Sequence, residues 1–141
     1  QHNSKIFLRN PLATRPWQHV FEPLSGYMEV AERLFECGSS ENDCWNFGPN
    51  NRDIRTVNEI VELFSSSWGI KNISEIDPSS QPHEAKSLSL DISKAQFKLG
   101  WFPKWDLENA IEKTVNWYKG YLNNDDLRSL SSRQIEDFFK N

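Results

Sequence analysis

The strand-like stretches of this sequence are all short, and they alternate with segments whose apolar residues recur at helical spacing. An apolar run at residues 5–9 and patterns at 15–21, 44–47, 73–76 and 86–91 predict four or five strands. Short strands need neighbours to be stable, since an isolated pair is marginal in water. We therefore expect an α/β fold that is mainly helical, with a few short strands and a sheet that is incomplete within the chain.

Five helices are expected, each from apolar spacing combined with a start or stop signal. They are residues 24–37, ending at Gly38; a helix after the Thr56–Glu59 capping box, ending at Gly69; 93–99, ending at Gly100; a long helix N-capped by Asp106; and a last short helix after a second capping box at Ser131–Gln134.

Composition indicates one soluble domain, residues 1–141, expected in the cytoplasm. Six Trp and nine Phe predict either a large aromatic core or a surface that expects a partner. The net charge of −4 argues against nucleic acid and anionic membranes as partners, and no apolar run is long enough for a membrane span. Cys37 and Cys44 fit no zinc pattern and are expected to be reduced thiols. Because the chain starts at Gln1 and not Met, we expect that something precedes it or that it was trimmed.

No complete catalytic set is present in the sequence. The six glycines never fall at G-x-G-x-x-G spacing, and no Tyr has a Lys four residues later. There is also no P-loop, HExxH or G-x-S-x-G motif. We therefore expect no catalytic, cofactor-binding or metal-binding residues in this chain.

Two clusters have the chemistry of ligand binding. In the first, Arg15 is suited to a phosphate and Trp17 to a sugar or base, with Gln18 and His19 beside them. The simpler alternative is an exposed arginine beside a core tryptophan and a structural histidine.

The second cluster is Gln81-Pro82-His83-Glu84. A glutamate held in a fixed loop can accept two hydroxyl hydrogen bonds, as a ribose would offer. The alternative for Glu84 is a solvated loop carboxylate.

Read together, several motifs resemble the C-terminal part of the CDP-glucose 4,6-dehydratases, in the extended short-chain dehydrogenase/reductase superfamily. The Asp-x-Ser-Lys-Ala stretch at 91–95 and Leu-Gly-Trp at 99–101 occur in many nucleotide-sugar epimerases and dehydratases. The Arg-Pro-Trp-Gln-His-Val stretch at 15–20 and Pro-His-Glu-Ala at 82–85 indicate the CDP-glucose branch.

The resemblance implies an enzyme with an N-terminal Rossmann domain holding NAD and a C-terminal lobe holding CDP-glucose. In that family NAD takes a hydride from sugar C4, water is lost across C5–C6, and the hydride returns to C6. The product, CDP-4-keto-6-deoxyglucose, leads to dideoxysugars of lipopolysaccharide and O-antigen. The catalytic residues belong to the Rossmann domain, so the resemblance implies a chain that is inactive alone and a complementary Rossmann-domain chain as partner.

Carried over residue by residue, Arg15 matches a contact to the substrate diphosphate and Glu84 a carboxylate near the ribose. Many relatives have a second diphosphate arginine where this chain has Gln81. Trp17, Gln18, His19 and His83 are further substrate-binding candidates, and residues 45–49 resemble a strand that returns to the Rossmann sheet. Two alternatives stay open: a binding or interaction module without catalysis, and a non-functional truncated gene product.

Overall fold

The computed structural model describes residues 5–38, 43–71, 73–77, 79 and 85–140. In this part the chain is mainly helical with a few three-residue strands, which confirms the expected fold class. The elements are β1 (Ile6–Leu8), β2 (Thr14–Pro16), α1 (Phe21–Cys37), the 3-10 turn η2 (Asn51–Asp53), β3 (Ile54–Thr56), α2 (Val57–Trp68), β4 (Ser74–Ile76), the π-helical turn η3 (Ala95–Leu99), α3 (Leu107–Leu122) and α4 (Leu127–Lys140).

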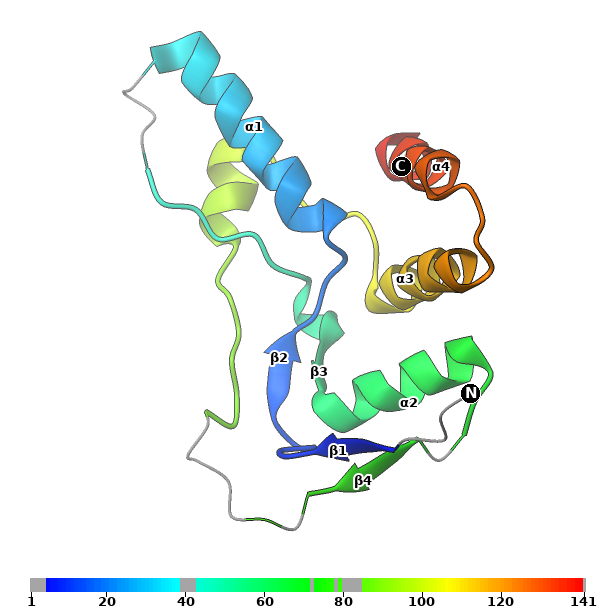
Figure 1. The fold of residues 1–141 in the computed structure, drawn as a ribbon. Coiled ribbons are helices and arrows are strands. Elements are labelled where there is room, and N and C mark those ends of the chain that lie inside the picture. Colours follow the sequence, from blue (N-terminus) through cyan, green and yellow to red (C-terminus); the bar gives the residue numbers. More distant parts are fainter. Residues whose placement is uncertain (1–4, 39–42, 72, 78, 80–84, 141) are drawn as a thin grey trace.

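The strands form two separate pairs (Figure 1). Strands β1 and β4 run parallel, and β2 and β3 run antiparallel. A single parallel bridge joins Thr14 of β2 to Ser87, so that the segment after residue 84 lies along the other edge of β2. Both sheets are therefore small and depend on the helices packed against them.

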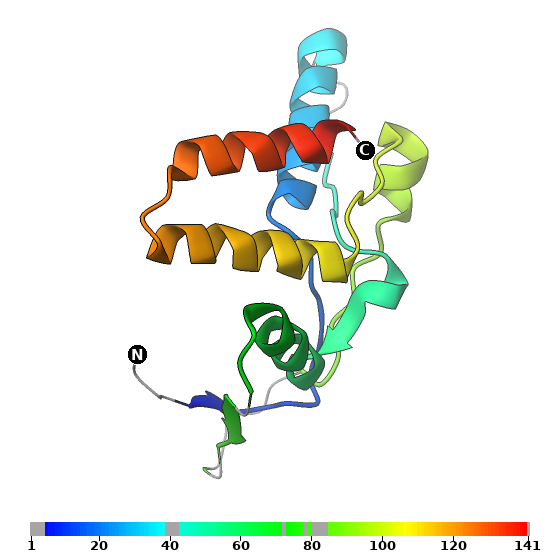
Figure 2. The same ribbon diagram turned by 90° about the vertical axis from the view of Figure 1, so that its right-hand side faces the viewer.

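Helices α2, α3 and α4 stack on one another on one side of the molecule (Figure 2). Helices α3 and α4 form an antiparallel hairpin, and α2 crosses α3. The interface between α2 and α3 is one of two core clusters. Its buried members are Leu107, Ile111 and Val115, with Trp17, Ile60, Leu63, Phe64 and Trp68 packed against them.

Helix α1 meets this stack at its first residue, where the Phe21 ring contacts the Phe138 ring of α4, and it packs on the other core cluster (Figure 1). There Gly26 faces the ring of Phe47, and Val30 contacts the same cluster. Several of the apolar residues that predicted the helix are exposed, although the Tyr27 ring still contacts the Phe47 ring, with 5.8 Å between the ring centroids. They are Leu24, Tyr27, Met28, Leu34 and Phe35, and we call them the α1 stripe.

Local start and stop signals are confirmed. The Thr56 hydroxyl accepts from the Glu59 backbone N–H at 3.2 Å, and the Glu59 carboxylate accepts from the Thr56 N–H at 2.8 Å, which completes the capping box. Asp106 caps α3 by accepting from the Asn109 N–H. Gly69 and Gly100 end their helices in the left-handed conformation.

Two predicted strands are wrong in extent. The strand expected over 15–21 ends at Pro16, because α1 already begins at Phe21. The strand expected over 86–91 is reduced to the bridge at Ser87. The alternating pattern is real in both stretches, but no partner strand continues alongside it.

The strand expected over 44–47 is also wrong. Its carbonyl oxygens are bonded by side chains in place of a neighbouring strand: Lys94 Nζ donates to Cys44 O at 2.8 Å, and Gln18 Nε2 donates to Phe47 O at 3.0 Å. The segment packs through Phe47, yet in the described part of the chain it joins no sheet.

The second capping box is wrong as well. Helix α4 begins earlier, at Leu127, where the Asp126 carboxylate accepts from the backbone N–H groups of Arg128 and Ser129. Ser131 lies inside the helix and accepts a hydrogen bond from the Trp117 indole at 3.0 Å. Gln134 is buried and donates to the Lys113 carbonyl oxygen at 2.8 Å.

Cys37 and Cys44 are exposed and form no disulfide, as expected. Among the described helices, none combines the length and the apolar character that a membrane crossing requires.

Candidate functional site

Arg15 and its neighbour Thr14 are hydrogen-bonded to residues 85–88, which directly follow the second predicted cluster. Backbone hydrogen bonds from Thr14 N to Lys86 O, at 2.9 Å, and from Leu88 N to Thr14 O, at 3.2 Å, hold that segment beside β2. The Arg15 guanidinium donates from Nη1 to the carbonyl oxygens of Thr14, at 2.7 Å, and Ala85, at 3.1 Å. Ala85 directly follows Glu84 in the sequence, so the structure brings Arg15 to the end of that cluster.

The other members of the second cluster, Gln81, His83 and Glu84, lie outside the described residues. Their predicted contacts to substrate therefore stay predictions. Ala85, whose carbonyl oxygen accepts a hydrogen bond from Arg15, is the first described residue after this cluster in the sequence.

Arg55 on β3 lies directly opposite Arg15 in the antiparallel register. Directly opposed residues of an antiparallel pair share one face of the sheet, with Cβ atoms about 4.5–5.5 Å apart. Arg55 also forms an ion pair with Glu59, with 3.7 Å between Nη1 and Oε1. Sequence reasoning did not single out Arg55, because the pairing of β2 with β3 is not local and has no signal in a short window of sequence.

Trp17 belongs to the core. Its ring packs on the α2–α3 cluster, and its indole Nε1 donates to the Arg55 carbonyl oxygen at 3.0 Å. In this position Trp17 fixes the spacing between the ends of β2 and β3.

Gln18 and His19 face a different region, a cleft of about 310 Å³ between the start of α1 and the α3–α4 hairpin. Gln18 Nε2 is bonded to Phe47 O, while its Oε1 is buried with no hydrogen-bond partner among the described residues. The cleft is also lined by Val20, Phe21, Thr114, Trp117, Tyr118, Ser131 and Gln134. The structure therefore does not bring the first cluster together as one site.

His19 is held as a neutral ring. Its Nδ1 accepts from the Phe21 N–H at 3.2 Å, so that in the neutral form Nε2 carries the proton. Burial, and then the charge of Lys113, lower the pKa of His19 to about 4. The edges of the Phe21 and Trp105 rings surround it. This geometry gives His19 a structural role at the start of α1, and its place in a binding site stays a prediction.

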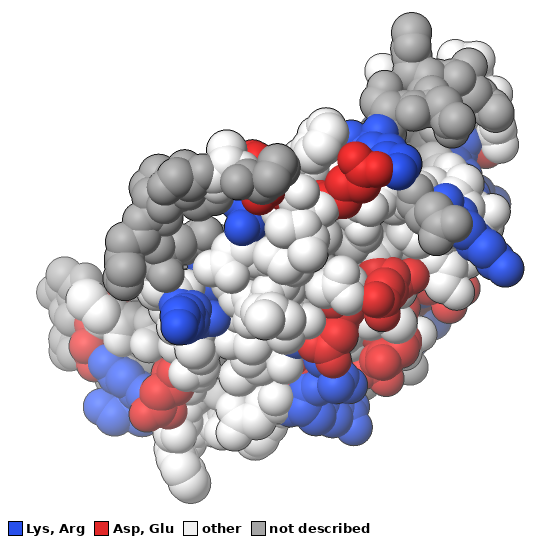
Figure 3. Space-filling model, turned by 90° about the horizontal axis from the view of Figure 1, so that it is seen from below, with Lys and Arg blue, Asp and Glu red and all other residues white. Residues whose placement is uncertain are grey.

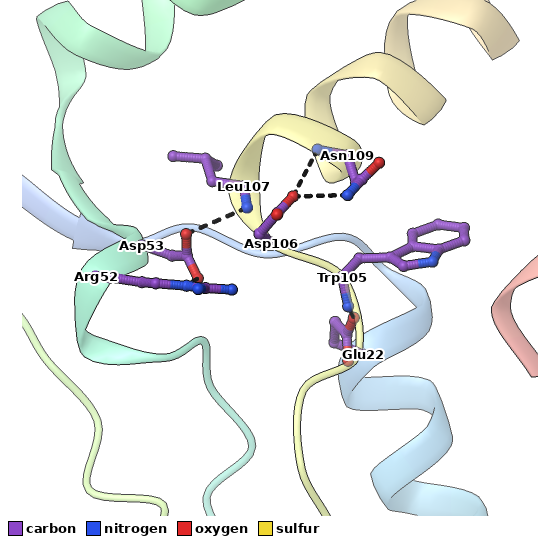
Figure 4. Close-up of polar contacts among 7 residues, drawn as sticks. All are labelled: Glu22, Arg52, Asp53, Trp105, Asp106, Leu107 and Asn109. Atoms are coloured by element: carbon purple, nitrogen blue, oxygen red, sulfur yellow. Dashed lines mark hydrogen bonds and ion pairs between the residues drawn. The ribbon is translucent and has the colours of Figure 1, made fainter. Parts of the chain in front are cut away.

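Carboxylates fix the turn that leads into α3 (Figure 4). Glu22 is completely buried and accepts from the backbone N–H groups of Lys104, at 3.1 Å, and Trp105, at 2.8 Å. Burial raises the pKa of Glu22 despite these two bonds. Asp53 accepts from the Leu107 N–H at 3.3 Å. The turn is thus tied both to α1 and to the residues that precede β3.

No group of His, Cys, Asp and Glu among the described residues is arranged to hold a metal ion.

No family model matches this chain. Several curated proteins do match it, and their names describe enzymes that act on nucleotide sugars. The chain is 42% identical to CDP-glucose 4,6-dehydratase of Salmonella typhimurium over 138 residues, which is 98% of this chain and 38% of that protein. It is 26% identical to dTDP-glucose 4,6-dehydratase of Escherichia coli over 78% of this chain and 31% of that protein. It is also 26% identical to UDP-glucose 4-epimerase of Pisum sativum over 79% of this chain and 31% of that protein.

A solved structure shares the fold. The crystal structure of dTDP-glucose 4,6-dehydratase from Bacillus anthracis, in complex with NAD, superposes with a TM-score of 0.63 at 23% identity. The match covers 82% of this chain and 35% of that one, so the chain spans well under half the length of its relatives. The resemblance to CDP-glucose 4,6-dehydratase is therefore confirmed along nearly the whole chain, and the chain shares the fold of part of a dTDP-glucose 4,6-dehydratase.

Proposed function

We propose that this chain is the substrate-binding part of a CDP-glucose 4,6-dehydratase, which converts CDP-glucose to CDP-4-keto-6-deoxyglucose and water in the cytoplasm. The observation that carries the proposal is the 42% identity over 98% of the chain. The position of Arg15, bonded to the residue after Glu84, supports it. The product would serve dideoxysugar and surface polysaccharide synthesis.

Within this proposal Arg15 neutralises the diphosphate and Glu84 accepts the ribose hydroxyls. A guanidinium matches phosphate oxygens in geometry and keeps its charge at every physiological pH. Its Nη1 donates to the carbonyl oxygens of Thr14 and Ala85, and these two contacts orient it. Trp17 packs in the core, and Gln18 and His19 line a separate cleft, so the proposal assigns them no contact with a substrate held at Arg15. His83 stays a predicted neighbour of the substrate.

The residues of this chain do not fit NAD. A dinucleotide site needs a glycine-rich turn between a strand and a helix, and no glycine spacing of that kind occurs. In the described part the parallel strands are only β1 and β4, with three residues each. We therefore assign no redox step to this chain and propose that a complementary NAD-binding polypeptide supplies it.

The α1 stripe supports such a partner. Phe35 is 92% exposed and Tyr27 61% exposed, although both lie on a well-formed helix. Apolar residues gathered on one exposed helix face are typical of a surface that another structure covers. The C-terminal part of α1, which carries Leu34 and Phe35, projects from the helix stack (Figure 1).

Calorimetric titration of the chain with CDP-glucose, in the presence of NAD, tests the proposal. We expect saturable binding and no 4-keto product until the complementary part of a dehydratase is added. Binding that never leads to product after this addition would favour a binding module without catalysis. Absence of binding, alone and in the mixture, would refute the proposal.

Arg15→Ala is the sharper version of the same test. Loss of a charge-assisted phosphate contact costs about 1.5–3 kcal/mol, so affinity for CDP-glucose should fall about tenfold or more. Arg33 on α1 is a suitable control, because it is a half-exposed arginine paired with Glu29 far from β2. Equal affinity of Arg15→Ala and Arg33→Ala would remove the diphosphate role of Arg15.

A further inference from the structure

Thr14 joins β2 to the segment that follows the second predicted cluster. Its backbone N–H donates to the Lys86 carbonyl oxygen at 2.9 Å, and its own carbonyl oxygen accepts from the Leu88 N–H at 3.2 Å. Its hydroxyl donates to the Ser87 hydroxyl at 3.0 Å. The segment lies along the edge of β2 that faces away from β3 (Figure 1). Ser87 thus adds a side-chain bond to the two backbone bonds that hold this segment to β2.

The attachment of this segment is short. The bridge between Thr14 and Ser87 is isolated, and no ladder continues beyond it in the described residues. Even a complete two-stranded pair is marginal in water, so one bridge holds the segment weakly and the hydroxyl pair matters for its position. Ser87 is exposed and Thr14 half-buried, so the pair lies at the surface and outside both core clusters.

The Arg15 guanidinium is oriented from both sides of this bridge. Its Nη1 donates to the Thr14 carbonyl oxygen on β2, at 2.7 Å, and to the Ala85 carbonyl oxygen on the segment, at 3.1 Å. Ala85 lies two residues before Ser87 in the sequence. A segment that moves away from β2 therefore carries the Ala85 carbonyl oxygen away from Nη1, and the orientation of the guanidinium is less defined.

This orientation matters because the overall charge of the chain does not hold an anion in place. The net charge is −4, and basic and acidic groups are interspersed on the face seen in Figure 3. An arginine side chain has several rotatable bonds, and ordering them when a ligand binds costs free energy. A guanidinium that is already held in place avoids part of this cost. Affinity for a diphosphate should therefore depend on the bonds that fix Arg15.

We propose that Ser87 is a positioning residue for diphosphate binding, which acts through the Arg15 guanidinium. Its bond to the Thr14 hydroxyl keeps the Ala85 carbonyl oxygen within reach of that guanidinium. This inference rests on the proposed function and adds to the same site a residue that does not itself touch the substrate.

The test compares Ser87→Ala with Ser87→Thr and with the control Ser89→Ala by calorimetric titration with CDP-glucose. Ser89 is an exposed serine in the same segment, and its side chain has no hydrogen bond to a described residue. We expect Ser87→Ala to weaken binding about two- to fivefold, because one hydrogen bond at the surface is lost. Ser87→Thr keeps the hydroxyl and should bind like the parent, as should Ser89→Ala. A Ser87→Thr variant that binds as weakly as Ser87→Ala would overturn the role of the hydroxyl.

A double-mutant cycle shows whether Ser87 acts through Arg15. In the Arg15→Ala background, Ser87→Ala should have no further effect on affinity, and an equal loss in both backgrounds would overturn the positioning role. If Ser87→Ala binds like the parent while Arg15→Ala loses affinity, the inference is wrong and the proposed function stands. If the unaltered chain does not bind CDP-glucose at all, both fail.

Discussion

The titration of His19 should dominate the acid sensitivity of the fold. In the folded chain its pKa is lowered to about 4, against 6.5 for the exposed ring, because the charged form is buried beside Lys113. The unfolded chain therefore binds a proton that the folded chain rejects. Stability is unaffected above pH 6.5 and is lost progressively as the pH falls from 6.5 towards 4.

The size of the effect follows from the shift. When the pH falls from 7.5 to 4.5, the lowered pKa of His19 reduces the free energy of unfolding by about 2–2.5 kcal/mol. Solvent at the edge of the ring that faces the cleft makes this reduction somewhat smaller. At an m value of about 2 kcal/mol/M, the urea midpoint should fall by about 1 M.

His19→Asn removes this titration and keeps an acceptor for the Phe21 N–H. The smaller side chain lowers stability at every pH, so the quantity to compare is the change in the urea midpoint between the two pH values. Glu22 and the other histidines titrate in both proteins and cancel in this comparison. We expect the variant to lose most of the pH dependence; the same dependence in both proteins would refute the buried neutral state of His19.

Three further predictions concern the site and the core. Glu84→Gln should weaken binding of CDP-glucose more than binding of glucose 1-phosphate, measured by calorimetry, and equal losses would exclude the ribose role. Phe138→Ala should lower the free energy of unfolding by about 3–5 kcal/mol in urea titrations, because the ring is completely buried, whereas the half-exposed neighbour Phe139→Ala should cost clearly less; similar costs would contradict the packing of α4. Gly26→Ala should lower the free energy of unfolding by about 1–3 kcal/mol, because the added Cβ would lie 2.4 Å from the Phe47 ring. A variant that is more stable than the parent, as is usual when alanine replaces glycine in a helix, would show that this contact is wrong.

The helix signals could be read from the sequence because they are local. The Thr56–Glu59 capping box and the Asp106 cap connect residues only three apart, so a short window contains both partners. The motif at Ser131–Gln134 has the same form but fails, because Asp126 supplies an earlier cap and Ser131 is used by Trp117.

The strand predictions failed where a partner was required. Alternation at 15–21 shows only that a segment can fit a pleated surface, and it does not identify a neighbouring strand. Residues 44–47 form no strand, because Lys94 and Gln18 bond carbonyl oxygens that a ladder would use. The pairing of β2 with β3, which places Arg55 opposite Arg15, joins residues 40 apart in sequence and had no local signal.

The two core clusters have different consequences for the proposed site. The α2–α3 cluster is formed by residues of α2 and α3 together with Trp17. The Trp17 indole is hydrogen-bonded to the carbonyl oxygen of Arg55 on β3. The cluster under α1 is covered on one side only, since the α1 stripe lies on the exposed face of the same helix. The strand pair bearing both arginines thus draws its support from the self-contained half of the chain. We therefore expect the pairing of β2 with β3 beside Arg15, which is set by contacts within this chain, to persist whether or not a partner covers α1.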